Sequence, residues 1–224
     1  MKKLGYTLQE VLIAMAAIGV VAALTIPMIT AGSRNQALAT KLAATVSDFE
    51  NGLTTMIVRE AAEDLTETEW YQNDCEAEDL VDSYKMQGFY NSGESGTYEG
   101  TSKENGKNSK LYKVDYNIAY QANNGALIFI KKEVNPVVRE GIGTYLGRIY
   151  FDVNGEEKPN RAGRDIFGYV FTETGHLYPI GGERASLLVQ NNYDNVWTKG
   201  SCEDGNITVG CTARLAEKGY KVDY

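Results

Sequence analysis

The sequence predicts an α+β protein in which a long N-terminal helix, transmembrane in its first half, packs against an antiparallel β-sheet. Three observations predict this class. An almost wholly apolar stretch covers residues 11–29, close to the roughly 20 residues that a helix needs to cross a bilayer. Residues 38–62 then repeat apolar side chains every three or four positions, as in a helix with one buried face. Beyond residue 110, short alternating segments separated by turn signals predict strands.

The composition argues against several classes of function. The chain has 224 residues, enough for one domain and an extension. Its net charge of −8 argues against a nucleic-acid partner, because phosphate binding needs clustered Lys and Arg. An acidic surface instead favours calcium or basic partners. One histidine and three cysteines are a poor set for metal or triad chemistry, so we expect no catalytic residues and no enzyme.

The N-terminal apolar stretch admits three interpretations. Lys2 and Lys3 precede it and would keep the N-terminus in the cytoplasm, with everything after Ile29 outside the inner membrane. A secretory signal peptide is disfavoured, because the stretch is long and the residues near Ala31 form a weak cleavage site. A plain membrane anchor leaves Glu10 unexplained, because a carboxylate at the edge of an apolar helix is costly.

The third interpretation accounts for Glu10. The segment Gly5-Tyr6-Thr7-Leu8-Gln9-Glu10, followed by the apolar stretch, resembles the prepilin processing site of type IV pilins and type II secretion pseudopilins. The resemblance implies that a prepilin peptidase cleaves between Gly5 and Tyr6 and methylates the new amine of Tyr6. It implies that Glu10 neutralises the N-terminal amine of a neighbouring subunit or of its own chain. Pro27 matches a helix-interrupting proline of the family, whereas Tyr6 stands where phenylalanine is more usual.

The resemblance also implies an organisation and a function. It divides the chain into a leader peptide (1–5), a transmembrane and filament-core helix (6–30), an amphipathic helix (31–62) and a pilin-like globular head with a β-sheet (63–224). The single-pass precursor would lie in the inner membrane with its head outside. It would then assemble with itself and other pilins, on an inner-membrane assembly platform, into a periplasmic or extracellular filament. The alternative is a membrane-anchored binding or adhesion protein that does not polymerise.

Within the head, residues 60–82 are acidic and predict a solvated connection with a short helix. Residues 88–110 are rich in Gly, Ser and Asn and predict a long surface loop. Expected strands cover residues 111–120, 126–132, 148–153, 167–171 and 176–180. Asn124-Gly125 is a hairpin signal between the first two strands, and residues 211–219 predict a short helix that ends at a glycine.

Oxygen-bearing side chains gather around a glycine turn after the third expected strand. The best candidate ligands for an ion are Asp152, Asn154, Asn160 and Asp165. Calcium binds roughly six to eight oxygens, and the segment looks like a loop common among pseudopilin-like proteins, so calcium is the one candidate cofactor. The alternative is an ordinary hairpin turn in which Asp and Asn side chains cap backbone groups.

The cysteines and the histidine have structural interpretations. Cys202 and Cys211 enclose eight residues, and in an oxidising compartment a disulfide there would contribute roughly 2–3 kcal/mol. Pilins often carry such a C-terminal loop, so the resemblance favours the disulfide over two separate buried thiols. Cys75 is then expected to be buried or free. His176 is expected to be structural, and the 15 tyrosines to form either an adhesive surface or ordinary sheet positions.

Overall fold

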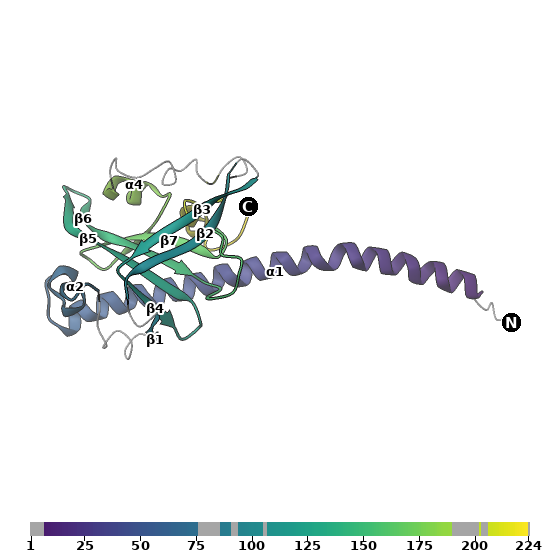
Figure 1. Cartoon of the computed structure of the whole chain (residues 1–224), viewed down its shortest axis with the longest axis horizontal. Helices are drawn as coiled ribbons and strands as arrows, with labels where there is room; N and C mark the ends of the chain where they lie inside the picture. Colours follow the sequence, from purple (N-terminus) through teal and green to yellow (C-terminus); the bar gives the residue numbers. More distant parts are fainter. Residues whose placement is uncertain are drawn as a thin grey trace. The chain divides into compact units, whose positions relative to one another are not determined.

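The chain contains an N-terminal apolar helix followed by an antiparallel sheet, which confirms the α+β class (Figure 1). The structure is a computed structural model, and it describes residues 7–75, 86–90, 94–104, 107–189, 202 and 206–223. The chain divides into two compact units, Met1–Ala37 and Leu38–Tyr224. Helix α1 (Leu8–Arg59) contributes residues to both units.

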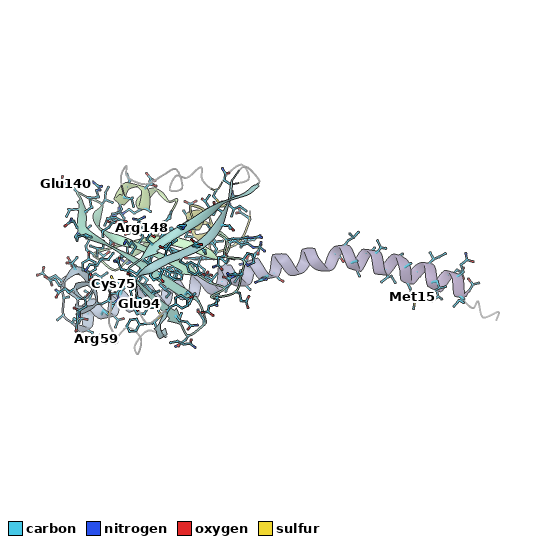
Figure 2. The ribbon with its side chains drawn as sticks, viewed as in Figure 1. Met15, Arg59, Cys75, Glu94, Glu140 and Arg148 are labelled. Atoms are coloured by element: carbon cyan, nitrogen blue, oxygen red, sulfur yellow. A yellow bond between two sulfur atoms is a disulfide. The ribbon has the colours of Figure 1, made fainter. Side chains whose placement is uncertain are left out.

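The first unit holds the apolar part of α1. Residues Leu8–Thr25 form a helical segment that is long and apolar enough to cross a membrane. Its large side chains are exposed, among them Ile18 at 69% and Leu24 at 70%, and Figure 2 shows Met15 projecting from the ribbon. By length and composition, this segment fits either a membrane anchor or a signal sequence.

Helix α1 has no break at Pro27, contrary to the predicted interruption. Proline removes one helical N–H donor, and the flanking turns nevertheless remain helical. The helix ends at Arg59 rather than near Ala62, because Ala61 adopts a left-handed conformation with φ of 51°. That conformation cannot continue a right-handed helix.

The second unit is built on a six-stranded sheet in which all neighbouring strands are antiparallel. The order across the sheet is β1-β4-β5-β6-β7-β8. The strands are β1 (Met86–Phe89), β4 (Ile118–Ala122), β5 (Leu127–Arg139), β6 (Gly143–Asp152), β7 (Ile166–Thr172) and β8 (Leu177–Pro179). The predicted hairpin turn at Asn124-Gly125 is confirmed between β4 and β5. Gly125 takes a positive φ of 78° there, and the Asn124 side chain accepts the Ala126 N–H.

One face of this sheet packs against the amphipathic part of α1, as the spacing of apolar residues predicted. Phe49 is at the centre of the contact. Its ring makes T-shaped, edge-to-face contacts with Trp70 and Phe151, at centroid distances of 6.4 and 6.0 Å. Burying each large apolar side chain contributes about 1.5–3 kcal/mol. The buried stripe of α1 consists of Ala39, Leu42, Val46, Phe49, Leu53 and Met56.

The opposite face of the sheet carries a second core that the sequence did not predict. Strands β2 (Gly96–Glu104) and β3 (Lys107–Tyr116) form a separate antiparallel pair, named here the β2–β3 ribbon. Val114 and Tyr116 of the ribbon belong to this second core together with Phe129 of β5. Helix α4 (Glu183–Val189) adds Ala185 and Leu188 to the same core.

The ribbon overturns the prediction of a long loop over residues 88–110. Gly and Ser hid the strand signal, although Thr97, Tyr98 and Thr101 are residues that favour strands. The predicted strand 111–120 is in fact split, because Asn117 separates β3 from β4. Its side-chain oxygen accepts the Lys132 N–H and holds the chain at this bend.

Two smaller predictions also change. The acidic segment holds the short helices η1 (Leu65–Glu67) and α2 (Glu69–Gln72), but Trp70 and Cys75 within it are fully buried, so its described part is not a solvated connection. Residues 76–82 of that segment lie outside the described residues. The C-terminal helix is present as α5 (Cys211–Glu217).

Candidate functional site

The structure describes only the C-terminal part of the predicted processing site, from Thr7 onward. Gly5 and Tyr6 lie outside the described residues, and Glu10 lies in the first turn of α1. Glu10 Oε2 accepts hydrogen bonds from the backbone N–H and the hydroxyl of Thr7, both at 2.8 Å. The Glu10 N–H in turn donates to Thr7 Oγ1 at 3.3 Å. Thr7 and Glu10 therefore form a capping box at the start of the helix.

Sequence reasoning missed this capping box, although the signal was present. Thr7-Leu8-Gln9-Glu10 has the Ser/Thr-x-x-Glu spacing directly before an apolar stretch. The box gives Glu10 a local partner, and a carboxylate is favourable at a helix N-terminus. A plain membrane anchor therefore also accounts for Glu10, contrary to the expectation from the sequence.

The structure brings the four candidate calcium ligands together between β6 and β7. Asp152 is fully buried at the end of β6, and Asp165 is 4% exposed directly before β7. The Asn154 N–H donates to Asp152 Oδ1 at 3.2 Å, and its side-chain amide donates to Asp165 Oδ2 at 3.5 Å. Asn160 Nδ2 donates to the Tyr98 hydroxyl at 2.7 Å, and that hydroxyl donates to Asp152 Oδ2 at 2.5 Å. Residues 152–165, which we name the acidic loop, thus hold one connected polar network.

The two carboxyl groups of the acidic loop are poorly solvated. Burial raises the pKa of Asp152 to about 7, and the nearby charge of Asp165 also raises it. Burial raises the pKa of Asp165 to about 6, even though its carboxylate accepts the Arg161 N–H. Lys41 of α1 interacts electrostatically with Asp152. Burial lowers the pKa of this lysine, so its charged form is disfavoured too. A divalent cation would stabilise both carboxylates in their charged form.

The oxygen atoms of the acidic loop fit calcium. The Oδ1 atoms of Asn154 and Asn160 are buried and accept no hydrogen bond from the protein. Together with the carboxylates of Asp152 and Asp165, they give an all-oxygen set of the kind that calcium binds. No group of three or more His, Cys, Asp or Glu side chains that could hold a metal occurs among the described residues, so the acidic loop offers two carboxylates and two amide oxygens. These four residues would hold the ion, and its charge would offset that of the carboxylates.

The same loop also shows the features of the alternative, an ordinary turn. Asp152 caps the N–H of Asn154, and Asp165 caps the N–H of Arg161. These bonds organise the turn without an ion. They leave the two amide oxygens of Asn154 and Asn160 unused, and those oxygens are what distinguishes this loop from a turn that is complete without a ligand.

Tyr98 is part of this network and was not predicted. It is separated from Asp152 by 54 positions and lies in a segment that the sequence suggested to be a loop. The register of the β2–β3 ribbon places it, and a single sequence does not reveal which residue of a ribbon crosses over a distant turn. Burial and the bond to Asp152 raise the pKa of the Tyr98 hydroxyl, which therefore acts as a neutral donor.

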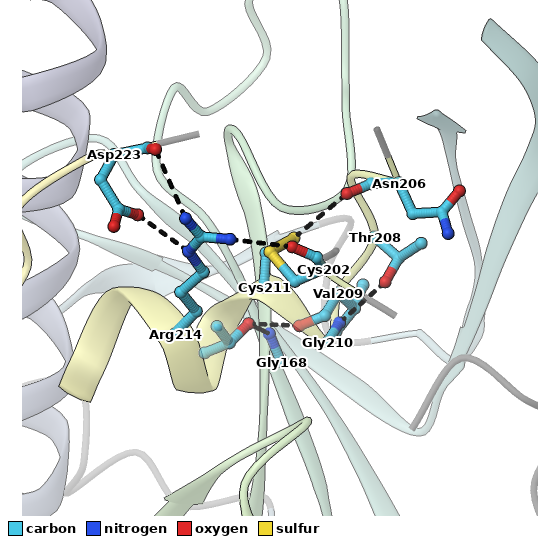
Figure 3. The surroundings of a disulfide bond; sticks show 10 residues. Gly168, Cys202, Asn206, Thr208, Val209, Gly210, Cys211, Arg214 and Asp223 are labelled. Carbon is cyan, nitrogen blue, oxygen red and sulfur yellow. Dashed lines mark hydrogen bonds and ion pairs between the residues drawn. A yellow bond between two sulfur atoms is a disulfide. The ribbon is translucent and has the colours of Figure 1, made fainter. Parts of the chain in front are cut away.

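Cys202 and Cys211 form a disulfide at the N-terminal end of α5 (Figure 3). Arg214 of α5 ties the surrounding backbone together. Its guanidinium donates to the Cys202 carbonyl at 3.1 Å and to Asp223 Oδ1 at 2.9 Å. The bond from Arg214 lowers the pKa of Asp223. The disulfide, α5 and the C-terminal segment thus form one connected structural region.

His176 and Cys75 occupy positions that suit structural roles. His176 directly precedes β8, and its Nδ1 lies 2.9 Å from Oε1 of Glu50. The same oxygen accepts the Leu177 N–H at 3.1 Å, so Glu50 connects α1 to the edge of the sheet. Cys75 has a free, fully buried thiol, and burial raises its pKa.

Comparisons with known proteins found no match to this chain among protein-family models, curated proteins or solved structures.

Proposed function

We propose that this chain is the precursor of a pilin-like structural subunit. In this proposal a prepilin peptidase removes residues 1–5 at the inner membrane, where the chain spans the bilayer once with its C-terminal part outside. The mature chain then assembles with itself and other pilins, through an inner-membrane platform, into a type IV pilus or type II secretion pseudopilus. It is not an enzyme, and its function is assembly.

The observation that carries the proposal is the contrast between the two parts of α1. From Leu38 onward, the apolar stripe of the helix is buried against the sheet of its own chain. Within Leu8–Thr25, large apolar side chains are exposed around the helix: Leu8, Val11, Leu12, Ile13, Met15, Ile18, Val20, Val21 and Leu24. Apolar surface in water costs about 25 cal/mol per Å². This part of α1 therefore needs lipid before assembly, and the helices of other subunits within a filament would supply the same environment.

Glu10 has two partners in this proposal. In the single chain, the carboxylate bonds to Thr7. In a filament core, where water is scarce, the carboxylate would pair with the methylated amine of Tyr6 on a neighbouring subunit, because opposite charges attract strongly at low dielectric. The capping box holds the carboxylate at the end of the helix until that partner arrives.

The capping box also favours a second candidate, a membrane-anchored binding or adhesion protein that does not polymerise. In that case, the bonds between Thr7 and Glu10 account for the carboxylate within one chain. The two candidates differ in whether the charge of Glu10 is needed beyond its role as a cap.

A pair of variants separates the two candidates in cells that contain an active prepilin peptidase. Glu10→Gln keeps a side chain that serves in a capping box but removes the charge, whereas Thr7→Ala removes the cap and keeps the charge. The proposal predicts a mature chain that begins at methylated Tyr6, measured by intact mass and N-terminal sequencing. It also predicts that Glu10→Gln is processed but excluded from filaments, and that Thr7→Ala is incorporated.

Three results would contradict the proposal. A chain that still begins at Met1 would support the plain anchor. Equal filament incorporation of Glu10→Gln and the wild type would mean that the charge has no role in assembly. A chain that begins near Ala31 would identify an ordinary secreted protein.

A further inference from the structure

We infer that calcium bound at the acidic loop stabilises the β2–β3 ribbon in its docked position. Tyr98 is the positioning residue that connects the ribbon to the loop. The inference rests on the candidate calcium site of Asp152, Asn154, Asn160 and Asp165. It does not depend on whether the chain forms filaments.

The backbone of the ribbon is attached at the acidic loop. Strands β2 and β3 pair with each other and form a sheet separate from the six-stranded sheet. The Thr101 N–H donates to the Asn160 carbonyl, and the Ala162 N–H donates to the Thr101 carbonyl, both at 2.8 Å. The position of the ribbon therefore depends on the backbone that flanks Asn160, one of the candidate ligands.

Tyr98 adds a side-chain link to two candidate ligands. Its hydroxyl donates to Asp152 Oδ2 at 2.5 Å and accepts from Asn160 Nδ2 at 2.7 Å. Its ring stacks on Phe129 of β5, with centroids 4.1 Å apart and planes 27° apart. The sheet thus fixes the ring, and the ring fixes the hydroxyl between Asp152 and Asn160.

The orientation of Asn160 follows from the same contacts. Its Nδ2 donates hydrogen bonds to the Tyr98 hydroxyl and, at 3.4 Å, to the Glu99 carbonyl. Both donors of the amide therefore face the ribbon, whereas its Oδ1 is buried without a hydrogen-bond donor. An ion is the kind of partner that an orphaned, oriented carbonyl oxygen can accept.

The ribbon and the loop are also in close steric contact. A Cβ atom placed on Gly100 would lie 2.6 Å from Cδ1 of Ile166 and 3.2 Å from the carbonyl oxygen of Asn160. A side chain at position 100 would therefore have to displace the Ile166 side chain and crowd the Asn160 carbonyl. The ribbon and the loop are therefore in van der Waals contact where the backbone hydrogen bonds of Thr101 join them.

These contacts couple the ion to the ribbon in both directions. Substitution of a residue that orients metal ligands typically lowers metal affinity 10–100-fold. Tyr98 orients both Asp152 and Asn160. By thermodynamic linkage, an ion that binds more tightly when the ribbon is docked also favours the docked ribbon by the same factor. Calcium should therefore hold the ribbon on the sheet, and its removal should loosen the ribbon selectively.

The test uses the full chain in detergent micelles, stripped of metal with EDTA and titrated with calcium chloride. Calorimetry measures calcium affinity, and hydrogen–deuterium exchange measures protection of the amides of residues 96–104. We expect calcium to slow exchange at Thr101 in the wild type. Tyr98→Phe keeps the stacked ring but should bind calcium about tenfold more weakly, and exchange of its ribbon should no longer respond to calcium.

Tyr116→Phe is the matched control. Its ring packs on the same Phe129, at a centroid distance of 5.1 Å, and among the described contacts its hydroxyl makes no bond to the acidic loop. This variant should behave like the wild type in both measurements. Near-UV circular dichroism would verify that both variants remain folded.

Several results would contradict the inferred coupling between calcium binding and docking of the ribbon. Wild-type affinity and protection in Tyr98→Phe would show that Tyr98 does not position the ligands. Calcium binding without any change in ribbon exchange would show that ion and ribbon are not coupled. Failure of the wild type to bind calcium would remove the site itself, whereas the proposed filament function, tested by N-terminal processing, would be unaffected.

Discussion

The carboxylates of Asp152 and Asp165 are both bonded to Asn154, one through its backbone N–H and the other through its side-chain amide. Both carboxyl groups are almost fully buried. Each charge is thus held near a like charge, in surroundings that solvate it poorly. This relationship makes the stability of the second unit sensitive to protons and to cations.

The first prediction concerns pH. Burial raises the pKa of Asp152 to about 7 and that of Asp165 to about 6, from ordinary values near 3.8. The folded chain therefore binds these protons more tightly than the unfolded chain does. Their contribution to stability is complete below pH 4 and is lost as the pH rises to about 7, at up to about 1.4 kcal/mol per pH unit for each carboxyl group. Urea unfolding of the metal-free protein, followed by tryptophan fluorescence, measures this slope.

A double variant provides the control for the pH prediction. Asp152→Asn combined with Asp165→Asn removes both titrating groups and should flatten the profile between pH 4 and 7. A profile of the wild type that is equally flat would mean that neither carboxyl group titrates in this range in the folded protein.

The second prediction concerns calcium. At pH 7.5, calcium at 100 times its dissociation constant should raise the free energy of unfolding by about 2.7 kcal/mol. The affinity should fall as the pH drops from 7 to 5, because protons compete for Asp152 and Asp165. Magnesium should stabilise less, since it demands a tighter octahedral set of ligands. Thermal unfolding with each ion tests this, and an equal effect of calcium on Asp165→Asn would contradict the site.

The third prediction concerns the core between α1 and the sheet. Phe49 is fully buried and contacts both Trp70 and Phe151. Phe49→Ala should lower the free energy of unfolding by about 3–5 kcal/mol, because it leaves a cavity among these rings. Val58 lies on the same helix but is 74% exposed, so Val58→Ala should change stability by less than about 0.5 kcal/mol. Similar effects of the two substitutions would argue that this face of α1 is not packed on the sheet.

The fourth prediction concerns the disulfide. Replacing both Cys202 and Cys211 by Ala should cost about 2–3 kcal/mol, because the unfolded chain regains the freedom of the closed loop. The bonds of Arg214 to the Cys202 carbonyl and to Asp223 should loosen as well. Hydrogen exchange across α5 measures that local effect. Unchanged exchange and unchanged stability would show that the disulfide is dispensable for this region.

The parts of the fold that follow from local sequence pattern were predicted well. The apolar spacing identified the buried stripe around Phe49 because a helix presents every third or fourth residue to the same side. Asn124-Gly125 identified the hairpin because few other residue pairs fit such a turn. The β2–β3 ribbon escaped prediction because its contacts are made with residues distant in the sequence, and because its Gly and Ser residues resemble those of a loop, although Gly100 and Ser102 are buried.

The candidate site likewise combines residues that are close in the sequence with one residue that only the tertiary structure brings near. Asp152, Asn154, Asn160 and Asp165 lie within one loop, so their proximity was visible in the sequence. Tyr98 comes from a distant strand and is placed there only by the tertiary structure. The capping box of Thr7 and Glu10 is local as well, because its Thr-x-x-Glu spacing lies directly before the apolar stretch.

The buried thiol of Cys75 gives the protein an internal reporter of its own opening. The other two cysteines are joined to each other, so Cys75 carries the one free thiol in the chain. Its side chain is inaccessible, its pKa is raised, and the Tyr120 hydroxyl bonds to its carbonyl. A thiol reagent needs an accessible thiolate. The rate at which such a reagent labels Cys75 in the purified protein would therefore measure how often the second unit opens, without any added probe.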